Sequence, residues 1–488
     1  MDKPVSPASA GLDRRPNVVF IFTDQHRADM LSCTGETPVR TPHLDRLAAG
    51  GTRLTRARCT TPLCMPSRTT YFTGCSARRN GTLANEIRLN AGGAHLATRL
   101  REAGYALALA GKNHAFTDDE LRQWDFVELY HMHGKEEKDY CSPPTEAERA
   151  VAKWRQECVP FFEAAVHEPQ PGRAEDDPAI AQTDHALRFL EDQAVEGAEH
   201  PFFLWLSYEA PHFPYVLPEP WFSRHDPARM PGLMDEELWK NVGPVRLRLQ
   251  HAGLRMDEMT DTDIRRVQAS YCGMIELVDE QVGRVLDALE RLKMRENTLI
   301  VFVADHGDFW GHRGLIGKSN ALYEDLLRIP TIWSLPGQVE GRTSSAIIEN
   351  TDFTPTLLDL LGLDPMASAQ GSSYATVLQG ASDRHRDFSI GESSLGLPAL
   401  TVDELEAAVL RRDELFSQEG PMWFVNRIGG LTRSLYRPPY KLITHEQDAS
   451  ELYDLENDPG ERENLAAQPA MRPVLGELLR QLETTSLA

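Results

Sequence analysis

The chain of 488 residues lacks the features that mark disulfide-stabilised, exported or membrane-spanning proteins. It has only seven cysteines, and none of them form a CxxC pair, so the sequence predicts neither a disulfide scaffold nor a typical zinc site. No apolar run is long enough to cross a bilayer, and the start of the chain has no long apolar stretch before a cleavage site. We therefore expect a cytoplasmic protein without a membrane partner.

Basic residues are scarce relative to acidic ones. The chain has 51 Lys and Arg against 73 Asp and Glu, and its formal net charge is -22. Binding to a phosphate backbone requires clustered Lys and Arg, so this balance argues against nucleic acid as a partner. It remains compatible with a small anionic substrate, provided that a few basic residues converge in one pocket.

Short apolar runs alternate with helical patterns along the chain. Four runs end in polar residues: NVVFIFTDQ (17–25), ALALAGKNH (106–114), PFFLWLSYEAPH (201–212) and TLIVFVADHGD (298–308). Nearly continuous apolar strands are typical of a parallel sheet covered on both faces. Helical patterns lie between these runs, at 41–51, with Thr41 as a possible cap, and at 263–292. The predicted fold class is α/β, with a ligand site at the carboxyl ends of the strands.

The C-terminal part of the chain has a different pattern. Residues 422–443 suggest short strands joined by turns, and a helical pattern returns near the end. We therefore expect an α/β domain at 1–379 and a subdomain at 380–488 with an antiparallel sheet and a closing helix. Segments 120–200 and 215–260 are charged and weakly periodic, so we expect them to be surface insertions.

Two of the strand ends carry residues that suit a metal ion. Asp24 and Gln25 follow the first apolar run, and Asp305 and His306 follow the last. Carboxylate and amide oxygens suit a hard divalent cation, and His306 slightly favours manganese over calcium. Either pair alone could equally cap a helix. Together they predict a metal site.

Cationic and imidazole side chains follow the same strand ends. Lys112 and His114 should lie on one side of an extended strand end. His212 and Lys318 each lie just beyond a later strand. With Arg68, these groups could bind a tetrahedral oxyanion, with Lys as point charges and His as general acid or base. A single Lys is usually exposed to solvent, so the hypothesis depends on these side chains lying close together in the fold.

The segment CTTPLCMPSRTTYFTG (59–74) adds a specific resemblance. CMPSRTTYFTG is similar to the signature of type I sulfatases, members of the alkaline-phosphatase-like superfamily, in which Cys-x-Pro-Ser-Arg leads into Thr-Gly. Further segments resemble that family in the same order: NVVFIFTDQHRADML, AGKNH, APHFPY, ADHGDFWGHRGLIGKSNALYEDLLRIPTI and ELYDLENDPGERENLA. The resemblance implies a fold like that of alkaline phosphatase, with a large, mainly parallel sheet flanked by helices.

The resemblance also implies a set of site residues. A separate maturation enzyme would convert Cys64 to formylglycine, whose hydrated aldehyde would be the nucleophile. The implied ligands of one divalent metal ion are Asp24, Gln25, Cys64, Asp305 and His306. The implied catalytic residues are Cys64, Arg68, Lys112, His114, His212 and Lys318.

Each catalytic residue has an implied role. Arg68 would hold the diol. The sulfate would be bound by Lys112, Lys318 and His212, which would also help to protonate the leaving oxygen. His114 would deprotonate the second hydroxyl, so that the sulfated intermediate collapses to the aldehyde and expels sulfate. A diol makes this release possible without attack of water on sulfur.

Two departures from the common pattern leave alternatives open. Gln25 and His306 stand where many sulfatases have Asp and Asn, and they resemble a branch that includes choline sulfatases and phosphonate monoester hydrolases. Calcium is favoured as the metal, with manganese and magnesium as alternatives. The primary hypothesis is hydrolysis of a small-molecule, aryl or carbohydrate sulfate monoester, because the Lys112-x-His114 pair favours sulfate esters.

Two other functions remain as alternatives. One is a phosphonate monoester or phosphodiester hydrolase with the same nucleophile. The other is an inactive binding protein that retains the fold, against which the complete set of site residues argues. A homo-oligomer is also compatible with a chain of this size.

Overall fold

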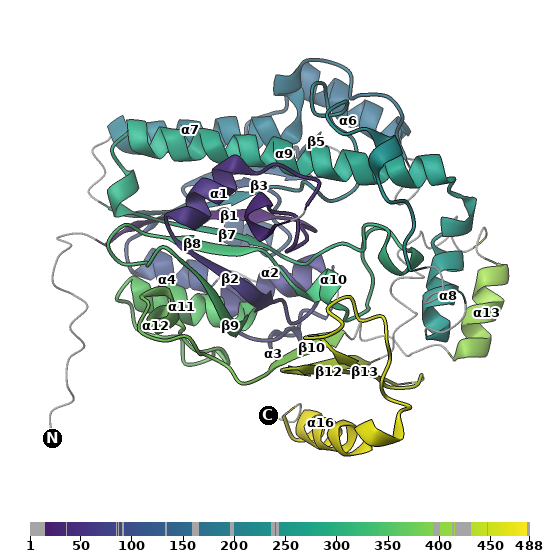
Figure 1. Cartoon of the computed structure of the whole chain (residues 1–488). Helices are drawn as coiled ribbons and strands as arrows, with labels where there is room; N and C mark the ends of the chain where they lie inside the picture. The colour runs from purple at the N-terminus through teal and green to yellow at the C-terminus, as the bar shows by residue number, and fades with distance from the viewer. Residues whose placement is uncertain are drawn as a thin grey trace, which may run out of the picture.

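A nine-stranded, mainly parallel sheet forms the centre of the computed structural model (Figure 1). Its strands are β1 (Asn17–Thr23), β2 (Thr52–Arg58), β3 (Ala106–Gly111), β4 (Phe126–His131), β5 (Gly134–Lys135), β6 (Phe202–Ser207), β7 (Thr298–Ala304), β8 (Thr331–Ser334) and β9 (Arg342–Glu349). Their order is β5-β4-β3-β6-β1-β7-β8-β2-β9. The structure describes residues 15–485, except 36, 84, 86, 90–91, 132–133, 159–164, 196–199, 236–239, 241–243, 394–400, 412–413, 415–430 and 447.

The four apolar runs identified in the sequence form neighbouring strands. They become β3, β6, β1 and β7, which are adjacent and parallel to one another. The side chains of 18–22 in β1 are fully buried, as expected for a strand covered on both faces. Because these strands are parallel, their polar carboxyl ends meet at one edge of the sheet, and the predicted α/β fold class is confirmed.

Helices cover both faces of this sheet. The helices described are α1 (Pro42–Ala49), α2 (Cys64–Thr73), α3 (Ala77–Asn80), α4 (Leu96–Glu102), α5 (Asp118–Leu121), α6 (Glu146–Cys158), α7 (Pro178–Val195), α8 (Val245–Gly253), α9 (Asp261–Arg291), α10 (Glu324–Leu327), α11 (Phe353–Leu360), α12 (Ala375–Leu378), α13 (Val402–Leu410) and α16 (Arg472–Thr485). In Figure 1, α1, α7 and α9 lie above the sheet, and α2, α4 and α11 lie below it. None of the described helices is long and apolar enough to cross a membrane.

Two sequence expectations were wrong in detail. Segment 120–200 is not simply a surface insertion, because β4 joins the central sheet and α7 packs against β3 with a buried apolar face.

Thr41 occupies the N-cap position of α1, but its side chain makes no capping bond. Its Oγ1 instead accepts the backbone N–H of Ser32, at 2.8 Å. The carboxylate of Asp279, from α9, accepts two N–H groups of the first turn of α1.

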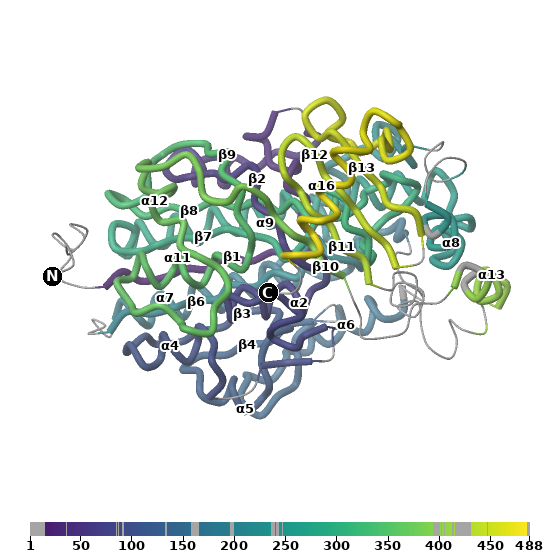
Figure 2. The backbone as a smooth tube through the Cα atoms, turned by 90° about the horizontal axis from the view of Figure 1, so that it is seen from below, coloured from purple at the N-terminus to yellow at the C-terminus, as the bar shows by residue number. Residues whose placement is uncertain are grey.

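The C-terminal part contains the small antiparallel sheet that the sequence predicts. Its strands are β10 (Ser389–Ser393), β11 (Thr432–Arg437), β12 (Tyr440–His445) and β13 (Glu451–Asp454). Leucines of α16 and of three strands form its core, and Figure 2 shows α16 lying across these strands. The predicted strand residues 422–430 lie outside the described residues. The boundary between residues 379 and 380 stays a prediction.

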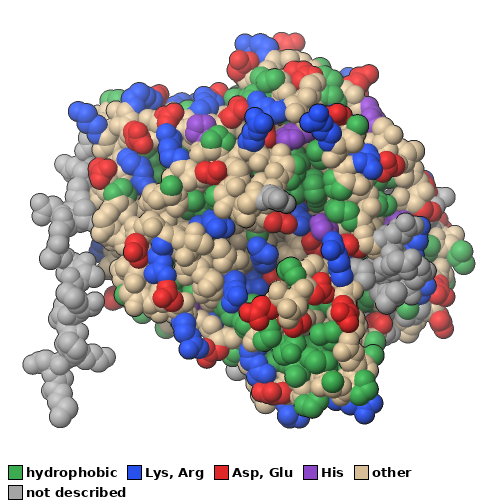
Figure 3. Space-filling view, in the orientation of Figure 1, with side chains coloured by type: hydrophobic (Ala, Val, Ile, Leu, Met, Phe, Trp, Pro, Cys, Tyr) green, Lys and Arg blue, Asp and Glu red, His purple; other side chains and the backbone are tan. Residues whose placement is uncertain are grey.

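On the molecular surface, acidic and basic side chains are interspersed over the face shown in Figure 3.

Candidate active site

Cys64 is the first residue of α2, immediately after the extended residue Leu63. The helix is fixed to the end of β7: Ser67 Oγ donates to the carbonyl of Asp305 at 2.6 Å, and the Tyr71 hydroxyl donates to that of Ala304 at 3.1 Å. The N-terminus of a helix presents unpaired N–H groups and a partial positive charge. These N–H groups favour negative charge beside Cys64, although burial and Asp24 oppose it on the thiol itself.

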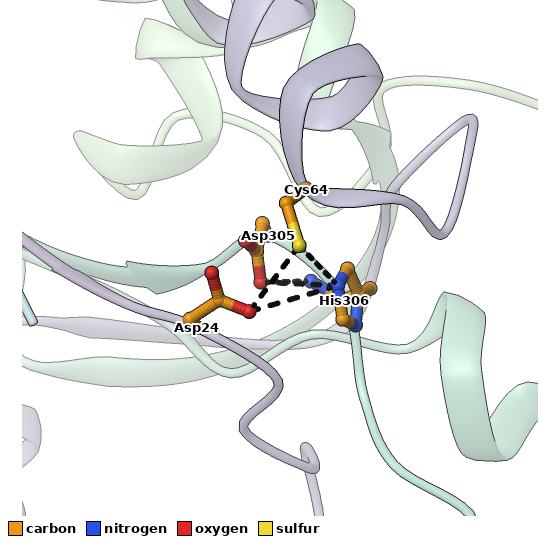
Figure 4. A group of neighbouring side chains, drawn as sticks. All are labelled: Asp24, Cys64, Asp305 and His306. Carbon is orange, nitrogen blue, oxygen red and sulfur yellow. Dashed lines mark hydrogen bonds and ion pairs between the residues drawn. The ribbon is translucent and has the colours of Figure 1, made fainter. Parts of the chain in front are cut away.

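Four buried side chains converge at the ends of β1, β7 and the start of α2 (Figure 4). One ligand atom from each of Asp24, Cys64, Asp305 and His306 lies within 4.8 Å of the others. Cys64 Sγ is 3.6 Å from Asp24 Oδ1 and 3.6 Å from His306 Nε2. Two carboxylates and an imidazole at this spacing fit a divalent cation. The structure thus brings together these four of the predicted metal ligands.

Gln25 adds an amide oxygen to this group. Its backbone has a φ of 66°, a left-handed conformation that residues other than glycine rarely adopt. Its Nε2 donates to Asp308 Oδ2 at 2.5 Å and to the Tyr215 hydroxyl at 3.2 Å. Its Oε1 is thereby turned toward the site, where it accepts from Lys318 Nζ at 3.2 Å. Asp308 is a functional candidate that the sequence reasoning missed.

Arg68 forms ion pairs with both metal-site carboxylates. Its Nε donates to Asp305 Oδ2 at 3.0 Å, and its Nη2 donates to Asp24 Oδ2 at 3.0 Å. The guanidinium is fully buried, which keeps both ion pairs away from water. Its described hydrogen bonds go to these carboxylates, Ser207 Oγ and the Lys112 carbonyl. The role of holding a diol at Cys64 stays a prediction.

Lys112 lies between two carboxylates. Its Nζ is 2.9 Å from Asp24 Oδ2 and 2.9 Å from Glu209 Oε1. Burial alone would raise the pKa of Asp24, but the charges of Lys112, Arg68 and Lys318 outweigh it and hold that pKa well below its usual value. Glu209 lies three residues before His212, and the sequence reasoning did not identify it. A lone acidic residue in a loop carries no recognisable pattern.

Lys318 connects Cys64 to His212. Its Nζ is 3.0 Å from Cys64 Sγ and 2.7 Å from His212 Nε2. Burial and the nearby Lys318 lower the pKa of His212 well below its usual value, so the imidazole is neutral. The hydrogen-bond network assigns the proton to Nδ1, which donates to the Phe213 carbonyl at 2.6 Å, and leaves Nε2 to accept from Lys318.

His114 lies at the edge of the group. The chain leaves β3 at Gly111, and His114 has a φ of 31°, so Lys112 and His114 do not continue an extended strand as the sequence suggested. Burial and the charge of Lys112 lower the pKa of His114 well below its usual value. Its neutral imidazole can accept a proton. Its ring centroid lies 5.4 Å from that of His131.

Known proteins resemble this chain in sequence and in fold. The sulfatase family model matches residues 16–363. The chain is 26% identical to an N-acetylglucosamine-6-O-sulfatase of Bacteroides thetaiotaomicron, covering 97% of this chain and 86% of the relative. It is 27% identical to a choline-sulfatase of Rhizobium meliloti, covering 93% and 83%. A solved phosphonate monoester hydrolase of Agrobacterium radiobacter has the same fold, with a TM-score of 0.76, 23% identity and 96% of each chain covered.

Proposed function

The chain belongs to the sulfatase family and is a sulfuric ester hydrolase, and from this premise we propose that Cys64 is converted to formylglycine and supplies the nucleophile. The convergence of Lys112, Lys318 and the metal-site carboxylates on Cys64 carries this proposal. Burial raises the pKa of the Cys64 thiol to about 11, so the thiol is almost entirely protonated at neutral pH. An unmodified Cys64 would therefore be a weak nucleophile.

A single divalent ion, with calcium favoured, would be held by Asp24, Gln25, Asp305 and His306 together with the modified Cys64. When bound, the ion would lower the pKa of the attacking hydroxyl and neutralise developing negative charge. Arg68 would contribute by holding the two carboxylates in place through its two ion pairs. Such preorganisation is a large part of electrostatic catalysis.

The remaining residues would act on the ester itself. Lys112 and Lys318 bring two positive charges to the Cys64 side of the site, where they would bind the sulfate oxygens. His212 orients Lys318 through its Nε2, and this pair would supply the proton for the leaving oxygen. His114 would accept the proton of the second hydroxyl of the nucleophile, because its imidazole is neutral.

The substrate would be a small-molecule or carbohydrate sulfate monoester. The names of the two relatives, an N-acetylglucosamine-6-O-sulfatase and a choline-sulfatase, support this range. A second candidate is a phosphonate monoester or phosphodiester, which the Gln25 and His306 variants favour. Site residues rather than the shared fold must decide between them.

Mass spectrometry of the peptide containing Cys64 tests the proposal. Protein produced together with a formylglycine-generating enzyme should carry the aldehyde or its hydrate at this position. It should also hydrolyse 4-nitrophenyl sulfate faster than bis(4-nitrophenyl) phosphate. An intact thiol in fully active protein, combined with full activity of Cys64→Ala, would exclude the formylglycine mechanism.

A further inference from the structure

Among the predicted site residues, His114 has the most exposed side chain. Every predicted site residue except His114 is at most 4% exposed, whereas His114 is half-buried. His114 therefore marks one side on which the organic part of an ester bound at Cys64 can reach solvent. The surroundings of His114 determine which organic groups fit.

A cavity begins one side chain beyond His114. His131, the last residue of β4, lies beside His114 and lines a cavity of about 340 Å³. The cavity lies between β5 and α6, which pack against each other at one end of the sheet (Figure 1). Its volume is at the lower end of the range for small-molecule sites, roughly 300–1,000 Å³.

The described lining of this cavity is polar and balanced in charge. It includes three basic residues, Lys135, Arg149 and Lys153, three acidic residues, Glu136, Glu137 and Glu148, and Gln156. No Phe, Tyr or Trp is among the described lining residues. An aryl group here would take charged side chains out of water without giving them partners. Hydroxyl groups can donate to Glu and accept from Lys and Arg.

The ion pairs of two basic residues at the cavity rim are long, although Arg149 Nη1 also donates to the Pro144 carbonyl at 2.6 Å. Arg149 Nε is 3.9 Å from Glu137 Oε1, and Lys153 Nζ is 3.8 Å from Glu157 Oε1. The side chains of Arg149 and Lys153 are 53% and 76% exposed. Such exposed pairs contribute at most about 1 kcal/mol. Lys153 can therefore turn toward a ligand at little cost, and Arg149 can do so by exchanging its hydrogen bond to Pro144 for one to the ligand.

We propose that this cavity is the subsite for the alcohol part of the ester and that it takes a neutral, hydroxyl-rich group, such as a monosaccharide. The balance of three cations and three anions favours a neutral group over a cationic or an anionic one. This inference rests on the proposed sulfatase function, because it needs the sulfate to lie at Cys64.

Kinetics of rim variants test the subsite. Arg149→Met and Lys153→Met should each raise the KM for glucose 6-sulfate or N-acetylglucosamine 6-sulfate about tenfold, and change that for 4-nitrophenyl sulfate no more than about twofold. Arg229→Met is a matched control, since Arg229 is exposed and does not line the cavity. It should change neither value.

Three results would overturn the subsite. The first is an equal effect of the rim variants on sugar and aryl sulfates. The second is the absence of any effect on sugar sulfates. The third is turnover of 4-nitrophenyl sulfate or choline sulfate by the wild type without turnover of either sugar sulfate. Failure of the proposed function gives a different result, namely that the matured wild type hydrolyses none of these sulfate esters.

Discussion

Individual buried charges in this site are held by several partners at once. Lys112 lies between Asp24 and Glu209, and Arg68 lies between Asp24 and Asp305. A buried charge that loses a partner retains its desolvation penalty, so each of these pairs is costly to break. Asp24 is the carboxylate common to both cations, which explains its strongly lowered pKa.

Glu209→Gln should destabilise the protein measurably. The substitution keeps the size of the side chain but leaves buried Lys112 with Asp24 as its remaining carboxylate. We expect the free energy of unfolding to fall by about 3 kcal/mol, measured by urea denaturation. Glu102→Gln, which affects an exposed pair with Arg99, should change it by less than about 0.5 kcal/mol. Equal effects of the two substitutions would contradict this account.

Asp308→Asn should weaken metal binding without replacing a predicted metal ligand. Asp308 accepts from Gln25 Nε2, and an Asn amide could place an N–H against that donor. Outer partners of this kind typically change metal affinity about 10–100-fold. Competition with a calcium chelator would measure the loss, and exposed Asp119→Asn is the control. Unchanged affinity would mean that Gln25 is oriented by other contacts.

Among the secondary-structure elements, the strands could be predicted from the sequence. The side-chain contacts that form where the strands end could not. Continuous apolar runs identified β1, β3, β6 and β7, because burial on both faces leaves a local signature. Glu209 and Asp308 have no such signature. Glu209 meets Lys112 across 97 positions of sequence, and Asp308 meets Gln25 across 283. Only the folded sheet brings these residues together.

The C-terminal sheet is joined to α10 by buried ion pairs. Lys441 Nζ, from β12, is 2.9 Å from Glu324 Oε1 and 2.7 Å from Glu461 Oε1. Arg58 Nη2 contacts the second oxygen of Glu324 at 2.7 Å. Because α10 follows the loop that carries Lys318, this cluster connects the C-terminal sheet to the active site.

Lys441→Met should destabilise this junction. Removal of the cation leaves two carboxylates buried side by side, which we expect to cost about 3–5 kcal/mol of unfolding free energy. Thermal denaturation would show the loss as a lower Tm. Arg437→Met, on the neighbouring strand β11, removes a more exposed pair with Glu477 and should have little effect. Similar Tm values for the two variants would show that the cluster adds no net stability.

At the scale of the whole molecule, stability should depend on the titration of Asp279. This side chain caps α1 from α9, and burial raises its pKa to about 7 even though two backbone N–H groups lower it. Its folded pKa lies above the unfolded value, so the protonated form is favoured in the folded state. The stability that protonation contributes is present below about pH 4 and is lost as pH rises through about 7.

Asp279→Asn should flatten this pH dependence. Between about pH 4 and 7, the wild type should lose up to about 1.4 kcal/mol of unfolding free energy per pH unit from this group, relative to the variant. Urea denaturation at several pH values measures the difference. Asp287→Asn, an exposed substitution on the same helix, should leave the slope unchanged. Parallel curves for the wild type and Asp279→Asn would contradict the raised pKa.

The burial of α2 also has a consequence for how active protein can be made. All ten of its residues, from Cys64 to Thr73, are buried. An enzyme that modifies Cys64 could reach it only while this segment is still an open chain, before it packs against β7. Under the formylglycine proposal, folding and modification would then compete for each newly synthesised molecule. A host in which folding wins would yield well-folded, soluble protein that stays inactive, and later addition of the modifying enzyme would not rescue it.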